Sequence, residues 1–224
     1  MKRIKLFINA LVKYLVGFAL IAILLFLPAG TFDYFGAWLF IGLLFIPIAA
    51  VGGILLVNHP QLLEKRLSTK EKENTQKGVV IFSFLMFVAS FTVAGLDFRF
   101  GWSNVSHSVT MAASVVMMVS YIFYALVMKE NAYLSRTVEV QKNQKVVDCG
   151  LYALVRHPMY TATILMFLSI PLVLGSWWAF ITFLPYPFII AVRIINEEKV
   201  LESGLAGYKE YKKKVRYRLI PFVW

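Results

Sequence analysis

Residues 157–192 read HPMYTATILMFLSIPLVLGSWWAFITFLPYPFIIAV and contain no Asp, Glu, Lys or Arg. Four earlier stretches share this property and are each at least 19 residues long: 14–32, 34–63, 78–96 and 100–128. Because about 20 apolar residues cross a bilayer as a helix, every one of these stretches is a candidate span. The chain of 224 residues is 59% hydrophobic and 16% charged, whereas a soluble domain has about 45–50% apolar and about 25% charged residues. The sequence therefore predicts an all-α, polytopic membrane helical bundle and excludes a disordered chain, a disulfide scaffold and a soluble Rossmann enzyme.

The run at 157–192 is too long for one membrane span. It has 36 residues and contains Pro171, Gly175, Pro185 and Pro187. A straight helix of that length would overshoot a bilayer, and prolines inside a helix break or kink it. We therefore predict a terminal helical hairpin that turns near residues 175–178 and follows four early spans. These spans are predicted at about 8–28, 36–57, 79–96 and 108–128.

The lysines and arginines predict the orientation in the membrane. With a terminal hairpin, the N-terminus and the loops 58–78, 129–158 and 193–224 share one side and hold 22 of the 23 basic residues. Only Arg99 lies on the other side. Because basic loops accumulate in the cytoplasm, we predict a multi-pass integral membrane protein with six passes and both termini cytoplasmic. It would lie in the cell membrane of a prokaryote or the endoplasmic reticulum of a eukaryote.

A net charge of +11 would suggest a nucleic-acid partner in a soluble protein. Here the membrane topology already accounts for the basic residues, so we predict no nucleic-acid partner. The basic run at 212–218 suits anionic headgroups, so membrane lipids are expected partners. Three histidines and the single Cys149 lie on different segments, which predicts no metal site and no internal disulfide. A Gly-rich phosphate loop and a G-x-S-x-G motif are absent from the sequence.

Two polar and aromatic segments, 138–160 and 193–221, bracket the predicted hairpin. The hairpin would bring them together at the membrane surface, where a donor-rich pocket can form. Pro158 suits the first turn of a helix, whose free N–H groups favour electron-rich ligand groups. Arg193 and Glu197 are four residues apart and share a helical face, close to an apolar run where ionisable groups are often functional. The simpler interpretation makes Arg156 an anchor of the span and His157 a helix cap. It makes Arg193 and Glu197 an interfacial salt bridge.

Several recognisable groups of residues follow one another through both segments. The first segment contains Val140-Gln141, Gln144-x-Val146-Val147-x-x-Gly150-x-Tyr152 and Arg156-His157-Pro158-Met159-Tyr160. The second segment contains Arg193-x-x-x-Glu197-Glu198, Tyr208-x-x-Tyr211 and Val215-x-Tyr217-Arg218-x-Ile220-Pro221. In this order, the groups resemble the isoprenylcysteine carboxyl methyltransferase family over residues 138–221.

This resemblance implies an integral membrane methyltransferase that uses S-adenosyl-L-methionine and releases S-adenosyl-L-homocysteine. It implies a cytoplasmic cofactor pocket closed by the C-terminal segment, and a lipophilic or prenylated substrate that enters from the bilayer. Residues 131–224 would form the methyltransferase core, and residues 1–130 would form spans one to four without a specific functional signal. By position, the implied cofactor-binding residues are Gln141, Gln144, Val146, Val147, Tyr152, His157, Pro158, Met159, Tyr160 and Glu197. Arg193 would bind the substrate, and Arg193 and Glu197 are the implied catalytic residues.

The chain departs from the family pattern in two places. Gln144 stands where the family often has His, and the stretch between Leu201 and Tyr208 is one residue shorter. Because a glutamine side chain still donates and accepts hydrogen bonds, we expect cofactor binding to survive the first departure.

The preferred reaction is carboxyl O-methylation of an isoprenylcysteine-like or other lipidic carboxylate. A carboxylate is ionised at neutral pH and needs no general base, and the Arg193 guanidinium can form two parallel hydrogen bonds to it. The first alternative is N-methylation of a phospholipid amine, with Glu198 as the nearest candidate base.

Two further alternatives remain open from the sequence. An NADPH-dependent integral membrane steroid or isoprenoid reductase shares the Arg-His-Pro and Ile-Pro groups, but its usual Arg-Asp pair after the last span is replaced here by Arg193-Ile-Ile-Asn-Glu-Glu. A membrane scaffold or small transporter is the non-enzyme alternative. It is disfavoured because the predicted spans hold few polar groups near the bilayer midplane.

Overall fold

The computed structural model describes residues 2–67, 74–131, 133–135 and 137–224. Its elements in chain order are α1 (Lys2–Ala29), α2 (Phe35–Asn58), α3 (Pro60–Leu67), α4 (Asn74–Phe100), α5 (His107–Glu130), the 3-10 turn η1 (Gly150–Ala153), α6 (Pro158–Val173), α7 (Trp177–Phe183), α8 (Tyr186–Gly204) and α9 (Tyr208–Lys214). All regular secondary structure within these ranges is helical, which confirms the predicted all-α bundle.

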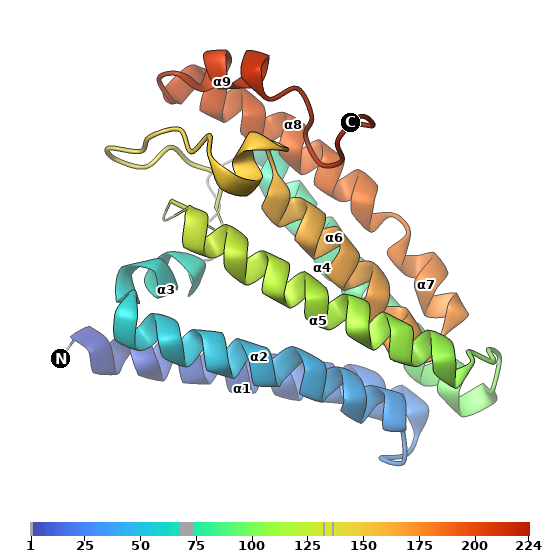
Figure 1. Ribbon diagram of the computed structural model, residues 1–224. Helices are drawn as coiled ribbons and strands as arrows, with labels where there is room; N and C mark the ends of the chain where they lie inside the picture. Colours follow the sequence, from blue (N-terminus) through green and yellow to red (C-terminus); the bar gives the residue numbers. More distant parts are fainter. Residues whose placement is uncertain (1, 68–73, 132, 136) are drawn as a thin grey trace.

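The long helices pack side by side with their axes roughly aligned (Figure 1). α1 and α2 run together along one edge, α5 lies along α6, and α4 contacts α1, α7 and α8. In the described part of the chain, five segments are long and apolar enough to cross a membrane: Arg3–Ala29, Phe35–Asn58, Gln76–Phe100, His107–Glu130 and Trp177–Gly204. α6 is apolar but shorter, with 16 residues. The chain is a multi-pass membrane protein built from these helices.

The predicted terminal hairpin is present, with α6 as one arm and α7 and α8 as the other. α6 ends at Val173, and Gly175 adopts a φ of +77°, a left-handed conformation that glycine reaches without a steric penalty. α7 begins at Trp177, so the chain reverses where the sequence predicts the turn. Pro185 separates α7 from α8, as a proline inside an apolar run is expected to do.

Asp97 joins the turn of this hairpin to α4. Its buried carboxylate accepts hydrogen bonds from the backbone N–H of Ser103 at 2.7 Å and from the Ser103 hydroxyl at 2.6 Å. The hydroxyl of Ser176, in the turn between α6 and α7, donates to the same carboxylate. These bonds fix the hairpin against α4 at the end of the bundle that contains α7, which we term the α7 end.

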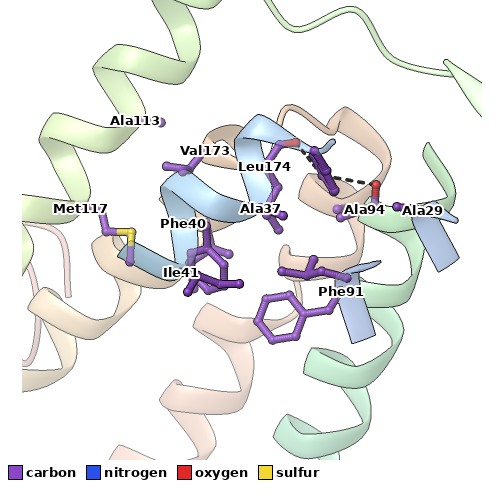
Figure 2. Close-up of a cluster of buried hydrophobic side chains, with 14 of the residues drawn as sticks. Ala29, Ala37, Phe40, Ile41, Phe91, Ala94, Ala113, Met117, Val173 and Leu174 are labelled. Atoms are coloured by element: carbon purple, nitrogen blue, oxygen red, sulfur yellow. Dashed lines mark hydrogen bonds between the residues drawn. The ribbon is translucent and has the colours of Figure 1, made fainter. Parts of the chain in front are cut away.

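Buried side chains from α1, α2, α4, α5, α6 and α7 form the core near the α7 end (Figure 2). Within it, the ring centroids of Phe40 and Phe91 lie 5.6 Å apart. Close helix approach depends on Gly95, because a Cβ there would lie only 2.5 Å from the carbonyl oxygen of Leu25 in α1. The packing therefore holds α4 directly against α1.

The connection expected at 58–78 contains α3, a short helix that the sequence pattern does not predict. Its Leu63 is buried, and Lys65 Nζ donates to Gln141 Oε1 in the loop that precedes η1. Lys13 of α1 donates to the carbonyl of Leu67 at the end of α3. α3 therefore lies at the end of the bundle that also contains η1 and α9 (Figure 1), which we term the α9 end.

Candidate active site

Glu198 is the centre of a buried ion-pair cluster at the α9 end. Arg156 Nε donates to Glu198 Oε1 at 2.7 Å, and Arg218 Nη2 lies 3.0 Å from Glu198 Oε2. His157 Nε2 lies 3.3 Å from Oε1, and Lys212 Nζ lies 3.7 Å from Oε2. Both Arg156 and Glu198 are almost fully buried. The cluster fixes the start of α6, the end of α8 and the C-terminal segment relative to one another.

The segment that follows α9 is hydrogen-bonded to the start of α6. The backbone N–H of Arg156 donates to Tyr217 O, and that of His157 donates to Arg218 O, both at 2.9 Å. Nη1 of Arg156 also donates to the carbonyls of residues 215 and 216, each at 2.8 Å. Because these bonds pair polar groups that would otherwise be buried without partners, they hold the C-terminal segment in place over α6.

A cavity at the α9 end lies between the loop after α5, the start of α6, α8 and α9; we term it the loop cavity. Its void is about 820 Å³, part of which is open to solvent. Eight of the ten predicted cofactor residues line it: Gln144, Val146, Val147, Tyr152, His157, Met159, Tyr160 and Glu197. The predicted substrate residue Arg193 lines it as well.

Gln141 and Pro158, the other two predicted cofactor residues, lie outside the described lining of the loop cavity. The Gln141 side chain receives a hydrogen bond from Lys65 and donates to Tyr133 O, while its backbone N–H donates to Gln144 Oε1 at 2.8 Å. Gln141 thus shapes the loop that bears Gln144. Pro158 is fully buried in the first turn of α6.

Tyr160 joins Arg193 to Glu197 across the cavity wall. Its hydroxyl donates to Glu197 Oε2 at 2.5 Å and accepts from Arg193 Nε at 2.8 Å. The sequence predicts that Arg193 and Glu197 share a helical face, and the structure places the hydroxyl of a third residue between them. The carboxylate and the guanidinium are thereby held at fixed positions beside the loop cavity.

A second cavity lies between α4, α6 and α8; we term it the helix cavity. Its void is about 1490 Å³, part of which is open. Apolar side chains dominate its wall, among them Val79, Phe84 and Phe87 of α4 and Phe167 of α6. Residues that line both cavities are Ser135, Thr137, Met159, Tyr160 and Arg193. The loop cavity and the helix cavity are therefore neighbours that share a wall containing Tyr160 and Arg193.

Two tyrosines of α9, Tyr208 and Tyr211, line the loop cavity, although the sequence motif predicts no specific role for them. Tyr211 donates to Tyr152 O at 2.7 Å. The hydroxyl of Tyr208 is buried, and among the described residues it has no hydrogen-bond partner. Burial raises the pKa of both phenols well above their ordinary value, so both remain protonated donors at physiological pH. The Tyr-x-x-Tyr spacing was the only sequence signal for them.

From the sequence, Glu198 is the nearest candidate for the base that amine N-methylation would need. The structure places it behind Arg156 and His157 and outside the described lining of both cavities. Its two carboxylate oxygens already bind Arg156 and Arg218. Its position is that of a structural ion pair. Because Arg156 and Glu198 are 42 residues apart, the sequence gives no local signal for this pairing.

Comparison with known families agrees with this arrangement. Residues 105–206 match the model of the phospholipid methyltransferase family, and the matched segment runs from α5 to the end of α8. A search of curated proteins found no match. The family match supports the predicted group of membrane methyltransferases and lends no support to the reductase alternative; the isoprenylcysteine carboxyl methyltransferase resemblance itself stays a prediction. On this evidence, the chain is a membrane enzyme of the S-adenosylmethionine-dependent methyltransferase class, similar over residues 105–206 to the phospholipid methyltransferases.

Proposed function

We propose that this enzyme transfers the methyl group of S-adenosyl-L-methionine to a carboxylate on a lipophilic substrate. The loop cavity would hold the cofactor and the helix cavity would hold the lipid. The observation that carries the proposal is the wall that the two cavities share, which contains Met159, Tyr160 and Arg193. A methyl donor in the loop cavity and an acceptor in the helix cavity would approach one another beside Tyr160 and Arg193, because these two residues line both cavities.

The residues of the loop cavity fit the proposed cofactor. The buried Tyr208 hydroxyl has no partner among the described residues, and a buried polar group in that state costs about 1–3 kcal/mol. A ligand rich in acceptors, such as a nucleoside, would remove this cost. Glu197 supplies a carboxylate for the cofactor's ammonium group, and Val146 and Leu205 supply apolar surface. The loop cavity therefore combines a carboxylate, a hydrogen-bond donor and an apolar surface.

When bound, the cofactor supplies a methyl group on a positively charged sulfur. The protein's own contribution is then mainly position, which can supply about 7–11 kcal/mol of the barrier in a well-aligned transfer. Tyr160 holds Glu197 and Arg193 in a fixed relation. Arg193 lines both cavities, and its guanidinium would bind the carboxylate of the acceptor. No residue has to remove a proton, because a carboxylate is ionised at neutral pH.

Amine N-methylation of a phospholipid is the second candidate, because the matched family is named for phospholipid substrates. An ammonium group must lose a proton before it can attack a methyl group, and the reaction therefore needs a base close to the acceptor. Glu198 is engaged by two arginines outside both cavities. This arrangement favours the carboxylate acceptor.

The same proposal includes the orientation of the chain in the membrane and its division into a methyltransferase core and preceding spans. We place both termini and the α9 end in the cytoplasm, because the basic residues of the N-terminus and of the loops around 58–78, 129–158 and 193–224 would then lie on that side. Residues 131–224 would form the methyltransferase core. α4, from residues 1–130, would supply one wall of the lipid site.

The proposal is tested with the full chain purified in detergent. Calorimetry with S-adenosylhomocysteine and with NADPH first identifies the cofactor, and binding of NADPH alone would contradict the proposal. Methyl-labelled S-adenosylmethionine is then supplied with N-acetyl-S-farnesylcysteine or with a phosphatidylethanolamine. Alkali releases methanol from a methyl ester but leaves an N-methyl group intact. Base-stable label confined to the amine lipid would overturn the carboxylate assignment and leave the methyltransferase assignment standing.

A further inference from the structure

The segment after α9 contains a turn whose apolar residues are exposed. Residues 220–223 read Ile-Pro-Phe-Val, and Ile220, Phe222 and Val223 are 52%, 87% and 74% exposed. Pro221 is exposed as well. Single exposed apolar residues are ordinary on a protein surface, but a contiguous group of them marks a surface that contacts another protein or a lipid phase. This turn is therefore a candidate contact surface.

Hydrogen bonds close this turn, so the exposure of its residues is a property of its shape. The backbone N–H groups of Arg218, Leu219 and Ile220 donate to the backbone oxygen of Trp224 at 2.8, 3.0 and 3.3 Å. The guanidinium carbon of Arg218 lies 4.9 Å from the ring centroid of Trp224. Phe222 has a φ of +65°, a left-handed conformation that residues other than glycine seldom adopt and that is costly for them. The closed turn thus presents a large apolar residue to the outside despite this cost.

The turn lies beside the place where α6 begins. The Thr161 hydroxyl donates to the Leu219 carbonyl at 2.9 Å, and the backbone N–H of His157 donates to the Arg218 carbonyl at the same distance. Both donors are at the start of α6, where the charge-free run 157–192 also begins. Because a charge-free run of this kind enters the hydrocarbon core close to its first residues, we expect residues 220–223 to lie near the boundary between lipid headgroups and acyl chains.

The residues around the turn carry an excess of positive charge. Residues 208–224 contain six Lys or Arg and one Glu, and Lys213 and Arg216 are exposed. Tyr217 adds an aromatic ring whose centroid lies 5.3 Å from that of Phe222, and tyrosine is enriched at the membrane–water boundary. Interfacial segments are attached to membranes by buried apolar side chains together with basic side chains that attract anionic lipids. Both properties match the surface of a bilayer that contains anionic lipid.

We propose that residues 220–223 are an interfacial anchor, whose apolar side chains enter the boundary between the headgroups and acyl chains of an anionic leaflet. The inference goes beyond the proposed function, because it holds for any cofactor and any methyl acceptor. Its consequence is that the chain returns to the bilayer after the polar helix α9. The segment that is hydrogen-bonded to the start of α6 is thereby attached to the lipid as well.

The test places a fluorescent label on the turn of the full chain. The chain contains a single cysteine, the exposed Cys149, so a Cys149→Ser chain with Phe222→Cys or Val223→Cys takes one nitrobenzoxadiazole label at the turn. The wild-type chain labelled at Cys149 is the matched control, because the neighbouring Asp148 forms an exposed ion pair with Lys214. The labelled chains are placed in nanodiscs of phosphatidylcholine alone or of phosphatidylcholine with an equal amount of phosphatidylglycerol.

Two quenchers then report the surroundings of each label: a lipid with a nitroxide near its headgroup, and iodide in the water. We expect lipid quenching at positions 222 and 223 to exceed that at Cys149 about threefold, and iodide quenching to be about threefold weaker, since a side chain inside the boundary is shielded from water. Lipid quenching at position 222 should rise further when phosphatidylglycerol is present, because the basic side chains attract its headgroup.

Iodide quenching as strong as that at Cys149 would overturn the proposal, because the turn would then face water. Weak quenching by both agents would overturn it too, since protein, such as a second copy of this chain, would then cover the turn. Equal lipid quenching in the two kinds of nanodisc would overturn the anionic partner. Since Val223→Cys reports on the same turn, it decides the question if the Phe222→Cys chain fails to fold.

Discussion

Arg156 and Glu198 are 42 residues apart in the chain, yet the Arg156 Nε atom lies 2.7 Å from a Glu198 carboxylate oxygen in a nearly dry environment. Arg156 itself lines the loop cavity, and Glu198 directly follows Glu197, which also lines it. The ion pair thus sets the distance between the two helices whose side chains form the proposed cofactor site. Its contribution to function is indirect and passes through the position of α6 relative to α8.

Glu198→Gln should destabilise the protein strongly. Removing one partner of a buried ion pair leaves the other charge uncompensated and costs about 3–5 kcal/mol. The thermal midpoint in detergent would report the loss, and Glu202→Gln on the partly exposed side of α8 provides the control. An unchanged midpoint for Glu198→Gln would show that the cluster does not hold the α9 end together.

Glu197→Gln should weaken S-adenosylhomocysteine binding about tenfold and leave the thermal midpoint nearly unchanged. A hydrogen bond to a charged group contributes about 1.5–3 kcal/mol, and each 1.4 kcal/mol corresponds to a factor of ten. The variant keeps an oxygen that can accept from Tyr160 but loses the charge that would face the ammonium group. Calorimetry is the measurement, and wild-type affinity in the variant would remove Glu197 from the cofactor site.

Tyr208→Phe should lower S-adenosylhomocysteine affinity roughly fivefold without lowering stability. Its hydroxyl makes no hydrogen bond to the described residues, so the free protein loses nothing when the hydroxyl is removed. Tyr211→Phe is the contrasting variant, because it leaves the buried carbonyl of Tyr152 without its donor. It should lower the thermal midpoint, and equal effects of both variants on stability would contradict this assignment.

The contribution of the Tyr208 hydroxyl to S-adenosylhomocysteine affinity should not depend on pH between 7 and about 9.5. Burial raises the pKa of this phenol well above its ordinary value, so the hydroxyl keeps its proton, and can donate it, throughout this range. The ratio of wild-type to Tyr208→Phe affinity, measured by calorimetry at several pH values, is therefore expected to stay constant. A ratio that falls as the pH rises would mean that the phenol ionises early and is more exposed than the structure shows.

Gly95→Ala should destabilise the bundle, because the added Cβ would lie 2.5 Å from the carbonyl of Leu25 and 3.0 Å from Pro28. Overpacking of this kind typically costs about 1–3 kcal/mol. Gly53→Ala in α2 is the matched control, since a Cβ there meets no described atom within 4 Å. The control should be neutral or slightly stabilising, as alanine favours helices. The thermal midpoints of the two variants, compared with that of the wild-type chain, test this prediction.

Much of the fold was predictable because it follows from local composition. The charge-free runs predict the long helices, and Gly175 and Pro185 mark where the last run turns and breaks. α3 was not predictable in the same way, because it is only eight residues long, four of them are polar, and contacts to the distant Gln141 and Lys13 hold it. Short polar helices depend on tertiary packing more than on propensity.

The candidate site was predictable as a set of residues but not as a geometry. The motif resemblance selected His157, Tyr160 and Glu197, and the structure places these three around one cavity. It gave no signal that Tyr160 would stand between Arg193 and Glu197, or that Glu198 would be enclosed by arginines. Such pairings join residues that are tens of positions apart, so a single sequence has no periodic pattern that encodes them.

The bonds of Asp97 to Ser103 and Ser176 have a mechanical consequence. They make the α7 end of the terminal hairpin a pivot, while the opposite ends of α6 and α8 are joined to the C-terminal segment. A widening between α4 and α8 that admits a bulky chain would then be a rotation about this pivot. The displacement would be smallest beside Phe183 and largest beside Arg193, where it would break the hydrogen bond that Gln76 of α4 donates to the Arg193 carbonyl at 3.1 Å.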